Sequence, residues 1–92
     1  MGKPRKIKVV YAKLGRDRAW GYYNDGTVYI DERLKGKKHL EICLHECLHH
    51  LFPDASEEEV IRKSVLLTNT LWKEGYRRID NDNSEELQDG KK

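Results

Sequence analysis

The chain has 92 residues, a length that suits a single small domain. Hydrophobic and charged residues each make up 37% of it, so the core must be small and much of the surface charged. The net charge of +2 is too small to indicate nucleic-acid binding. The sequence contains neither an apolar run of ~18 residues that could span a membrane nor the apolar core of a signal peptide. The spacing of the two cysteines does not suit a disulfide. Reduced thiols are typical of intracellular proteins, so we expect a cytoplasmic protein.

The N-terminal third of the chain predicts a small β-sheet. Three segments are rich in β-branched and aromatic residues, at residues 6–12, 19–23 and 27–31. The dipeptide Asp25-Gly26 separates the last two, and it is a strong turn signal because both residue types tolerate positive φ. We therefore expect a hairpin within a three-stranded, mainly antiparallel sheet.

A first amphipathic helix is predicted from about residue 38 to Leu51. Phe52-Pro53 ends it, because the residue before a proline avoids helical dihedral angles. At about 100° per residue, its apolar residues form one face that should pack on the sheet: Leu40, Cys43, Leu44, Cys47, Leu48 and Leu51. The same phase places Ile42 on the opposite side of the helix, together with His45 and His49.

A second helix is predicted from Ser56 to about residue 74. Ser56 and Glu59 form a capping box, and Gly75 is a suitable C-terminal cap. The fold class is therefore α+β, with a three-stranded sheet packed on two helices in one domain of residues 1–79. We expect the polar residues 80–92 to form a disordered tail.

The first helix carries the sequence His45-Glu46-Cys47-Leu48-His49, which matches the pattern H-E-x-x-H. Histidines four residues apart on a helix lie about 40° apart around its axis, near enough to bind one metal ion. The glutamate between them can deprotonate a water molecule that the metal activates. The motif predicts a zinc site with His45 and His49 as ligands and Glu46 as the general base.

A catalytic zinc ion usually takes a third protein ligand, and the second helix offers acids at its start. At about 100° per residue, Glu57 lies within the inward stripe of that helix, whereas Glu58 and Glu59 lie outside it. The short loop after the first helix should bring Glu57 near His49. We predict Glu57 as the third ligand, with Glu58 as its main rival and Asp54 ranked third.

Several other residues have weaker claims. His39 and His50 are out of phase with the histidine pair and are expected to face solvent. Phase likewise places Cys43 and Cys47 on the apolar face, as buried thiols rather than ligands. Tyr76 is either a donor to a reaction oxyanion or a packing residue. The segment 27–31 is a candidate edge strand that could bind an extended peptide by β-addition.

Three segments resemble a known family: Leu44–Asp54, Ser56–Val60 and Leu71–Arg77. They are similar to short metallopeptidase-like proteins of bacteriophages and bacteria, related to the ImmA/IrrE group, and look like a minimal zincin of the gluzincin type. The resemblance implies zinc binding by two histidines and an acid on the next helix, a catalytic glutamate, and a site of action in a bacterial or phage-infected cytoplasm. These roles carry over to His45, His49, Glu57 and Glu46, although the acid lies closer to the motif here than in that group.

The sequence therefore predicts a zinc-dependent metallopeptidase that hydrolyses peptide bonds of an intracellular protein or peptide. The alternative is a non-catalytic module in which zinc stabilises the fold and the surface binds a partner protein. Neither interpretation includes nucleic acid or a membrane as a partner. Nucleic-acid binding through the basic N-terminal segment is a third alternative, for which the charge signal is weak.

Overall fold

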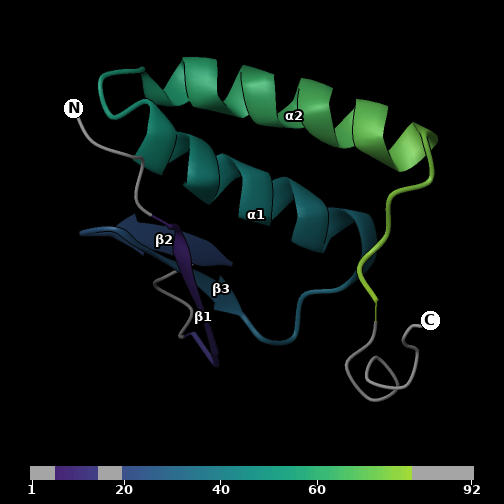
Figure 1. Cartoon of the computed structure of the whole chain (residues 1–92), viewed down its shortest axis with the longest axis horizontal. Helices are drawn as coiled ribbons and strands as arrows, with labels where there is room; N and C mark the ends of the chain where they lie inside the picture. The colour runs from purple at the N-terminus through teal and green to yellow at the C-terminus, as the bar shows by residue number, and fades with distance from the viewer. Residues whose placement is uncertain (1–5, 15–19, 80–92) are drawn as a thin grey trace.

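The computed structural model describes residues 6–14 and 20–79 (Figure 1). Three strands, β1 (Lys8–Ala12), β2 (Gly21–Asn24) and β3 (Thr27–Asp31), precede two helices, α1 (Gly36–Leu51) and α2 (Glu57–Lys73). Helix α1 lies between the sheet and α2 and contacts both. The expected α+β fold is confirmed, whereas Ala19 of the second predicted strand and the predicted tail of residues 80–92 lie outside the described residues.

The strands are ordered β1-β3-β2 in one sheet. Strands β2 and β3 form the predicted hairpin, in which Asp25 (φ 47°) and Gly26 (φ 84°) occupy the left-handed positions of a two-residue turn. Strand β1 pairs with β3 in parallel, so the sheet is mixed. Because β3 is the central strand, the prediction that residues 27–31 form an open edge is wrong, and β2 is the edge strand of the hairpin.

The core lies between the sheet and α1. Val28 and Ile30 are fully buried, and Ile42, Cys43 and Cys47 of α1 pack against the cluster that they form with Leu34. The prediction that Ile42 faces away from the sheet is therefore wrong. A single apolar stripe cannot describe α1, because this helix buries one side on the sheet and another on α2.

Helix α2 turns three small or β-branched residues, Val60, Ser64 and Thr68, inward at intervals of one helical turn. Small side chains on this stripe let the two helix axes come close.

Leu48 of α1 is buried, whereas Leu51, which the phase of the helix predicts on the apolar face, is 55% exposed. Within the described residues, neither helix is long and apolar enough to cross a membrane.

Candidate metal centre

The side chains of His45, His49 and Glu57 converge between α1 and α2. The two Nε2 atoms of His45 and His49 lie 3.2 Å apart. The carboxylate of Glu57 spans both rings, with Oε2 3.1 Å from Nε2 of His45 and Oε1 2.9 Å from Nε2 of His49. One ligand atom from each residue thus falls within 4.8 Å of the others, and the group could hold a metal ion.

The spacing of these atoms is a test of whether an ion fits. Ligands bonded to zinc at 2.0–2.1 Å in a tetrahedron lie roughly 3.3 Å from one another. The separation of 3.2 Å between the two Nε2 atoms is close to that value, and each Nε2 atom has one of the two Glu57 oxygens 2.9 or 3.1 Å away. The group also opens onto a cleft of about 380 Å³, which leaves room for a further ligand. Two imidazoles and one carboxylate in this arrangement therefore suit a divalent transition metal with an open coordination position.

Local structure explains why Glu57 is the acid at this place. The hydroxyl of Ser56 accepts a hydrogen bond of 3.1 Å from the backbone N–H of Glu59, so Ser56 caps α2 and Glu57 is its first residue. This cap fixes the phase of the first turn, and Glu57 points back to α1 while Glu58 stays outside the ligand group. The carboxylate also lies near the positive end of the α2 dipole.

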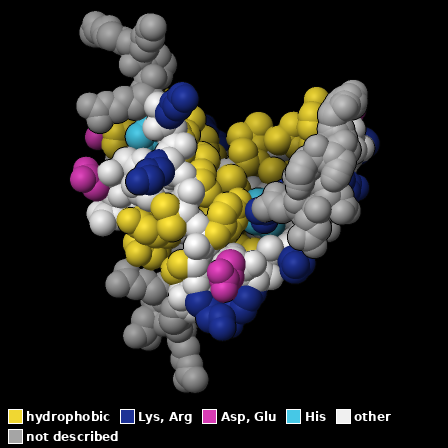
Figure 2. Space-filling model, turned by 60° about the horizontal axis from the view of Figure 1, so that its bottom comes forward, with side chains coloured by type: hydrophobic (Ala, Val, Ile, Leu, Met, Phe, Trp, Pro, Cys, Tyr) yellow, Lys and Arg dark blue, Asp and Glu magenta, His cyan; other side chains and the backbone are white. Residues whose placement is uncertain are grey.

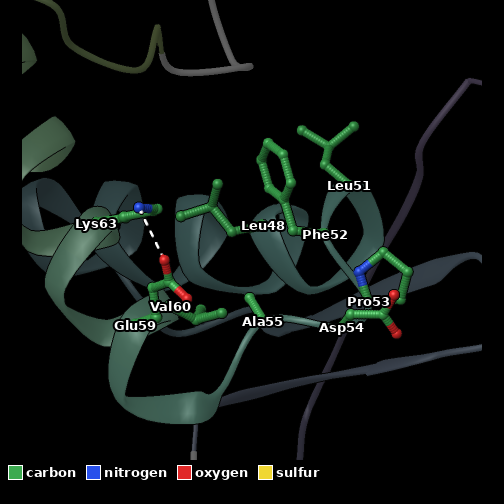
Figure 3. A pocket seen from close by; sticks show the side chains of 9 residues that line it. All are labelled: Leu48, Leu51, Phe52, Pro53, Asp54, Ala55, Glu59, Val60 and Lys63. Atoms are coloured by element: carbon green, nitrogen blue, oxygen red, sulfur yellow. Dashed lines mark ion pairs between the residues drawn. The ribbon is translucent and has the colours of Figure 1, made fainter.

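Asp54, the third candidate acid, belongs to a different cleft. This cleft of about 460 Å³ lies between the end of α1 and the start of α2, and Figure 3 shows its lining. Apolar side chains such as Leu51 and Phe52 form much of its wall, and the ion pair of Glu59 with Lys63 crosses one side. The structure therefore brings only one of the three candidate acids to the histidine pair.

Glu46 lines the same cleft as the histidine pair but is itself only 7% exposed. Removal from water raises the pKa of its carboxyl, while the neighbouring His45 and His49 oppose that rise. The side chain lies near the edge strand β2, because a Cβ built on Gly21 would stand 3.6 Å from Cγ of Glu46. Glu46 is thus a sheltered carboxyl group that lines the same cleft as the candidate ligands.

Gly21 is a site residue that sequence reasoning missed. A Cβ at this position would lie 2.8 Å from Cγ2 of Ile42 and 2.9 Å from the carbonyl oxygen of Tyr29. Only a glycine lets α1 approach β2 this closely, and this approach brings Glu46 into the cleft. The single sequence signal was a glycine inside a predicted strand, which often marks a close backbone approach.

Two other histidines pair with tyrosines instead of facing solvent as predicted. The hydroxyl of Tyr23 lies 3.0 Å from Nδ1 of His50 and also accepts a hydrogen bond from the backbone N–H of Gly26. His39 is buried, with Nε2 3.0 Å from the hydroxyl of Tyr11. Both pairs tie α1 to the sheet, and neither histidine belongs to the ligand group.

Tyr76 and the two cysteines also lie apart from the ligand atoms. Tyr76 follows α2, whose 17 residues extend about 25 Å from Glu57, so the interpretation of Tyr76 as an oxyanion donor is wrong. Cys43 and Cys47 are half-buried against the core, as their phase predicts. The hydrogen bond with Cys47 lowers the pKa of the Cys43 thiol.

No protein-family model, curated protein or solved structure matches the chain.

Proposed function

We propose that the protein is a zinc-dependent metallopeptidase with a minimal zincin-like fold, acting on an intracellular protein or peptide. The observation that carries this proposal is the convergence of His45, His49 and Glu57 on one point of an open cleft, with the carboxyl of Glu46 beside it. The likeness of residues 44–54 to phage and bacterial metallopeptidase-like proteins supports the same proposal.

The ligand set and the sheltered glutamate have separate roles. A zinc ion held by His45, His49 and Glu57 would activate a water molecule and polarise the scissile carbonyl. Glu46 accepts the proton of the attacking water and later delivers it to the leaving amine. The raised pKa of its carboxyl suits this exchange, because a general base works best when its pKa approaches the working pH.

The edge of β2 offers a place for the substrate backbone. In an antiparallel pair, alternate residues turn both backbone polar groups away from the partner strand. The pair of Asn24 with Thr27 closes the hairpin, so the outward groups belong to Gly21 and Tyr23, both of which line the cleft. An extended peptide added to this edge would run past Glu46 and the ligand group.

Zinc content and peptide hydrolysis, measured on the native chain and on Glu46→Gln, test the proposal. We expect the variant to bind zinc like the native chain and to lose hydrolysis by about 10²–10⁴-fold, because only the proton-transfer group is removed. A native protein that holds zinc stoichiometrically but cleaves nothing in a diverse peptide library would contradict the proposal. That result would favour the zinc-stabilised interaction module instead.

A further inference from the structure

The net charge of the chain is small, but acidic and basic residues are distributed unevenly along the two helices. The start of α2 has acids at Glu57, Glu58 and Glu59, whereas the first turn of α1 has no acid. Exposed cations gather at the α1 start and in the segment after α2: Lys35, Lys37, Lys38, Arg77 and Arg78. Lys35, Arg77 and Arg78 line one cavity together with one acid, Glu32, which shows that the two segments lie side by side. One end of the molecule is therefore basic, and we call these five residues the basic end.

Aromatic rings lie among these cations. The guanidinium carbon of Arg77 lies 3.6 Å from the ring centroid of Trp72, and that of Arg78 lies 4.7 Å from the centroid of Tyr11. Arg33, in the loop before α1, lies 5.9 Å from the centroid of Trp20. The described part of this chain has three such contacts, and in each the arginine belongs to the basic end or lies within two residues of it.

A groove runs between these groups. It consists of two adjoining cavities of about 170 and 140 Å³, which share Gly36, Trp72, Arg77 and Arg78. Tyr76 lines the larger cavity and is 62% exposed. Figure 2 shows a hollowed face on which hydrophobic side chains lie between patches of Lys and Arg. The groove thus offers aromatic surface on its wall and positive charge at its rim.

We infer that this groove binds single-stranded nucleic acid. The lysines and arginines of the basic end contact phosphates, and a base stacks beside Trp72 and Tyr76. Guanidinium groups placed over aromatic rings suit flat bases, whereas an acidic peptide would use the cations alone. A duplex would keep its bases out of reach of the rings. Gly36 and His45 are nine residues apart on α1, about 13 Å, so binding here does not depend on the metal centre or its proposed activity.

Fluorescence anisotropy with a labelled oligothymidylate of about 15 nucleotides tests this inference on the full chain. We expect micromolar binding at low salt that weakens as salt rises, with a log–log slope of about −3.5 for roughly five phosphate contacts. Tyr76→Ala should weaken binding about fivefold or more, and Tyr76→Phe, which keeps the ring, should bind like the native chain. Lys37→Glu/Lys38→Glu should weaken binding and reduce the slope by about 1.4.

Arg62→Glu/Lys63→Glu is the matched control, because it makes the same charge change on exposed residues near the start of α2. It should bind the oligonucleotide as the native chain does. Equal losses in the two charge-reversal variants would overturn the inference, since binding would then follow net charge alone. Equal affinity for inorganic polyphosphate, or binding of a polyglutamate peptide in place of the oligonucleotide, would overturn it as well. Circular dichroism of each variant verifies that the fold is kept.

Discussion

Oε1 of Glu57 lies 2.9 Å from Nε2 of His49, and this contact joins the first turn of α2 to the last turn of α1. The contact depends on a five-residue connection, 52–56, that reverses the chain between the helices. A metal ion at this place would crosslink the two helices of a domain with few fully buried hydrophobic side chains among its described residues. Metal binding and folding should therefore be coupled in this protein.

Replacement of Glu57 by alanine should remove a direct ligand. We expect Glu57→Ala to lower zinc affinity more than about 100-fold, because loss of a ligand should exceed the 10–100-fold cost of losing an outer partner of a ligand. Competition with a chromogenic chelator measures the affinity. Glu58→Ala, which makes the same change one residue along the first turn, is the control and should bind zinc like the native chain. Equal losses in both variants would exclude Glu57 as the specific ligand.

Glu46→Gln should raise the melting temperature of the metal-free protein. Burial raises the pKa of the Glu46 carboxyl, which means that the fold disfavours its charged form at neutral pH. A neutral amide of the same shape avoids that cost, so the group that we propose as the base in hydrolysis lowers stability. Differential scanning calorimetry in the presence of a chelator measures the change. Glu58→Gln on the exposed face of α2 should leave the melting temperature unaltered, and an unaltered value for Glu46→Gln would contradict the prediction.

Gly21→Ala should damage both the fold and the site. The added methyl group would meet Cγ2 of Ile42 and the carbonyl oxygen of Tyr29, and the latter belongs to the central strand and cannot move alone. Overpacking of this kind costs about 1–3 kcal/mol, which urea unfolding followed by tryptophan fluorescence measures. Displacement of α1 should also reduce peptide hydrolysis through Glu46.

Gly26→Ala provides the comparison for that variant. It makes the same chemical change in the same hairpin, at a residue with φ 84° and open space around it. Its cost of about 1 kcal/mol comes from backbone strain and should leave hydrolysis per folded molecule unchanged. If both variants lower hydrolysis equally, Gly21 has no special role in placing Glu46.

The sequence predicts the features that depend on local chemistry. Asp25-Gly26 supplies the positive φ of the hairpin turn, and Ser56 supplies the cap that sets the phase of Glu57. The phase of α2 then ranks Glu57 above its neighbours, which agrees with the carboxylate that meets the histidines. In each case a few consecutive residues determine the outcome.

Features that depend on distant contacts could not be predicted in this way. Alternation within β1 reveals a strand but not that it pairs in parallel with β3. Ile42 faces the sheet because α1 has two buried sides, which a single apolar stripe does not describe. Gly21 has no side chain, and this absence allows the close approach of α1 to β2. The hydrogen bond between His39 and Tyr11 joins residues that are 28 positions apart in the sequence.

Asp31 ends β3 in a site without exposure to solvent, and its carboxylate accepts several hydrogen bonds. Nε and one terminal nitrogen of Arg33 donate across 2.8 and 2.6 Å, and the backbone N–H of Leu14 donates across 3.2 Å. Chiefly through Arg33, these donors hold the pKa of the Asp31 carboxyl well below its ordinary value of 3.8. This network holds the end of β3 to the residues after β1.

The pH dependence of unfolding should reveal this network. A carboxyl whose pKa is lowered by folding stabilises the native state above its unfolded-state pKa of 3.8, and this contribution is lost as the pH falls from there through the lower folded pKa. Arg33→Met removes the side-chain donors and should be less stable than the native chain at pH 7. The difference in the free energy of unfolding should then shrink as the pH falls from about 4 toward 2. Urea unfolding across this range measures both curves, and a difference independent of pH would show that Arg33 acts by packing rather than through the Asp31 charge.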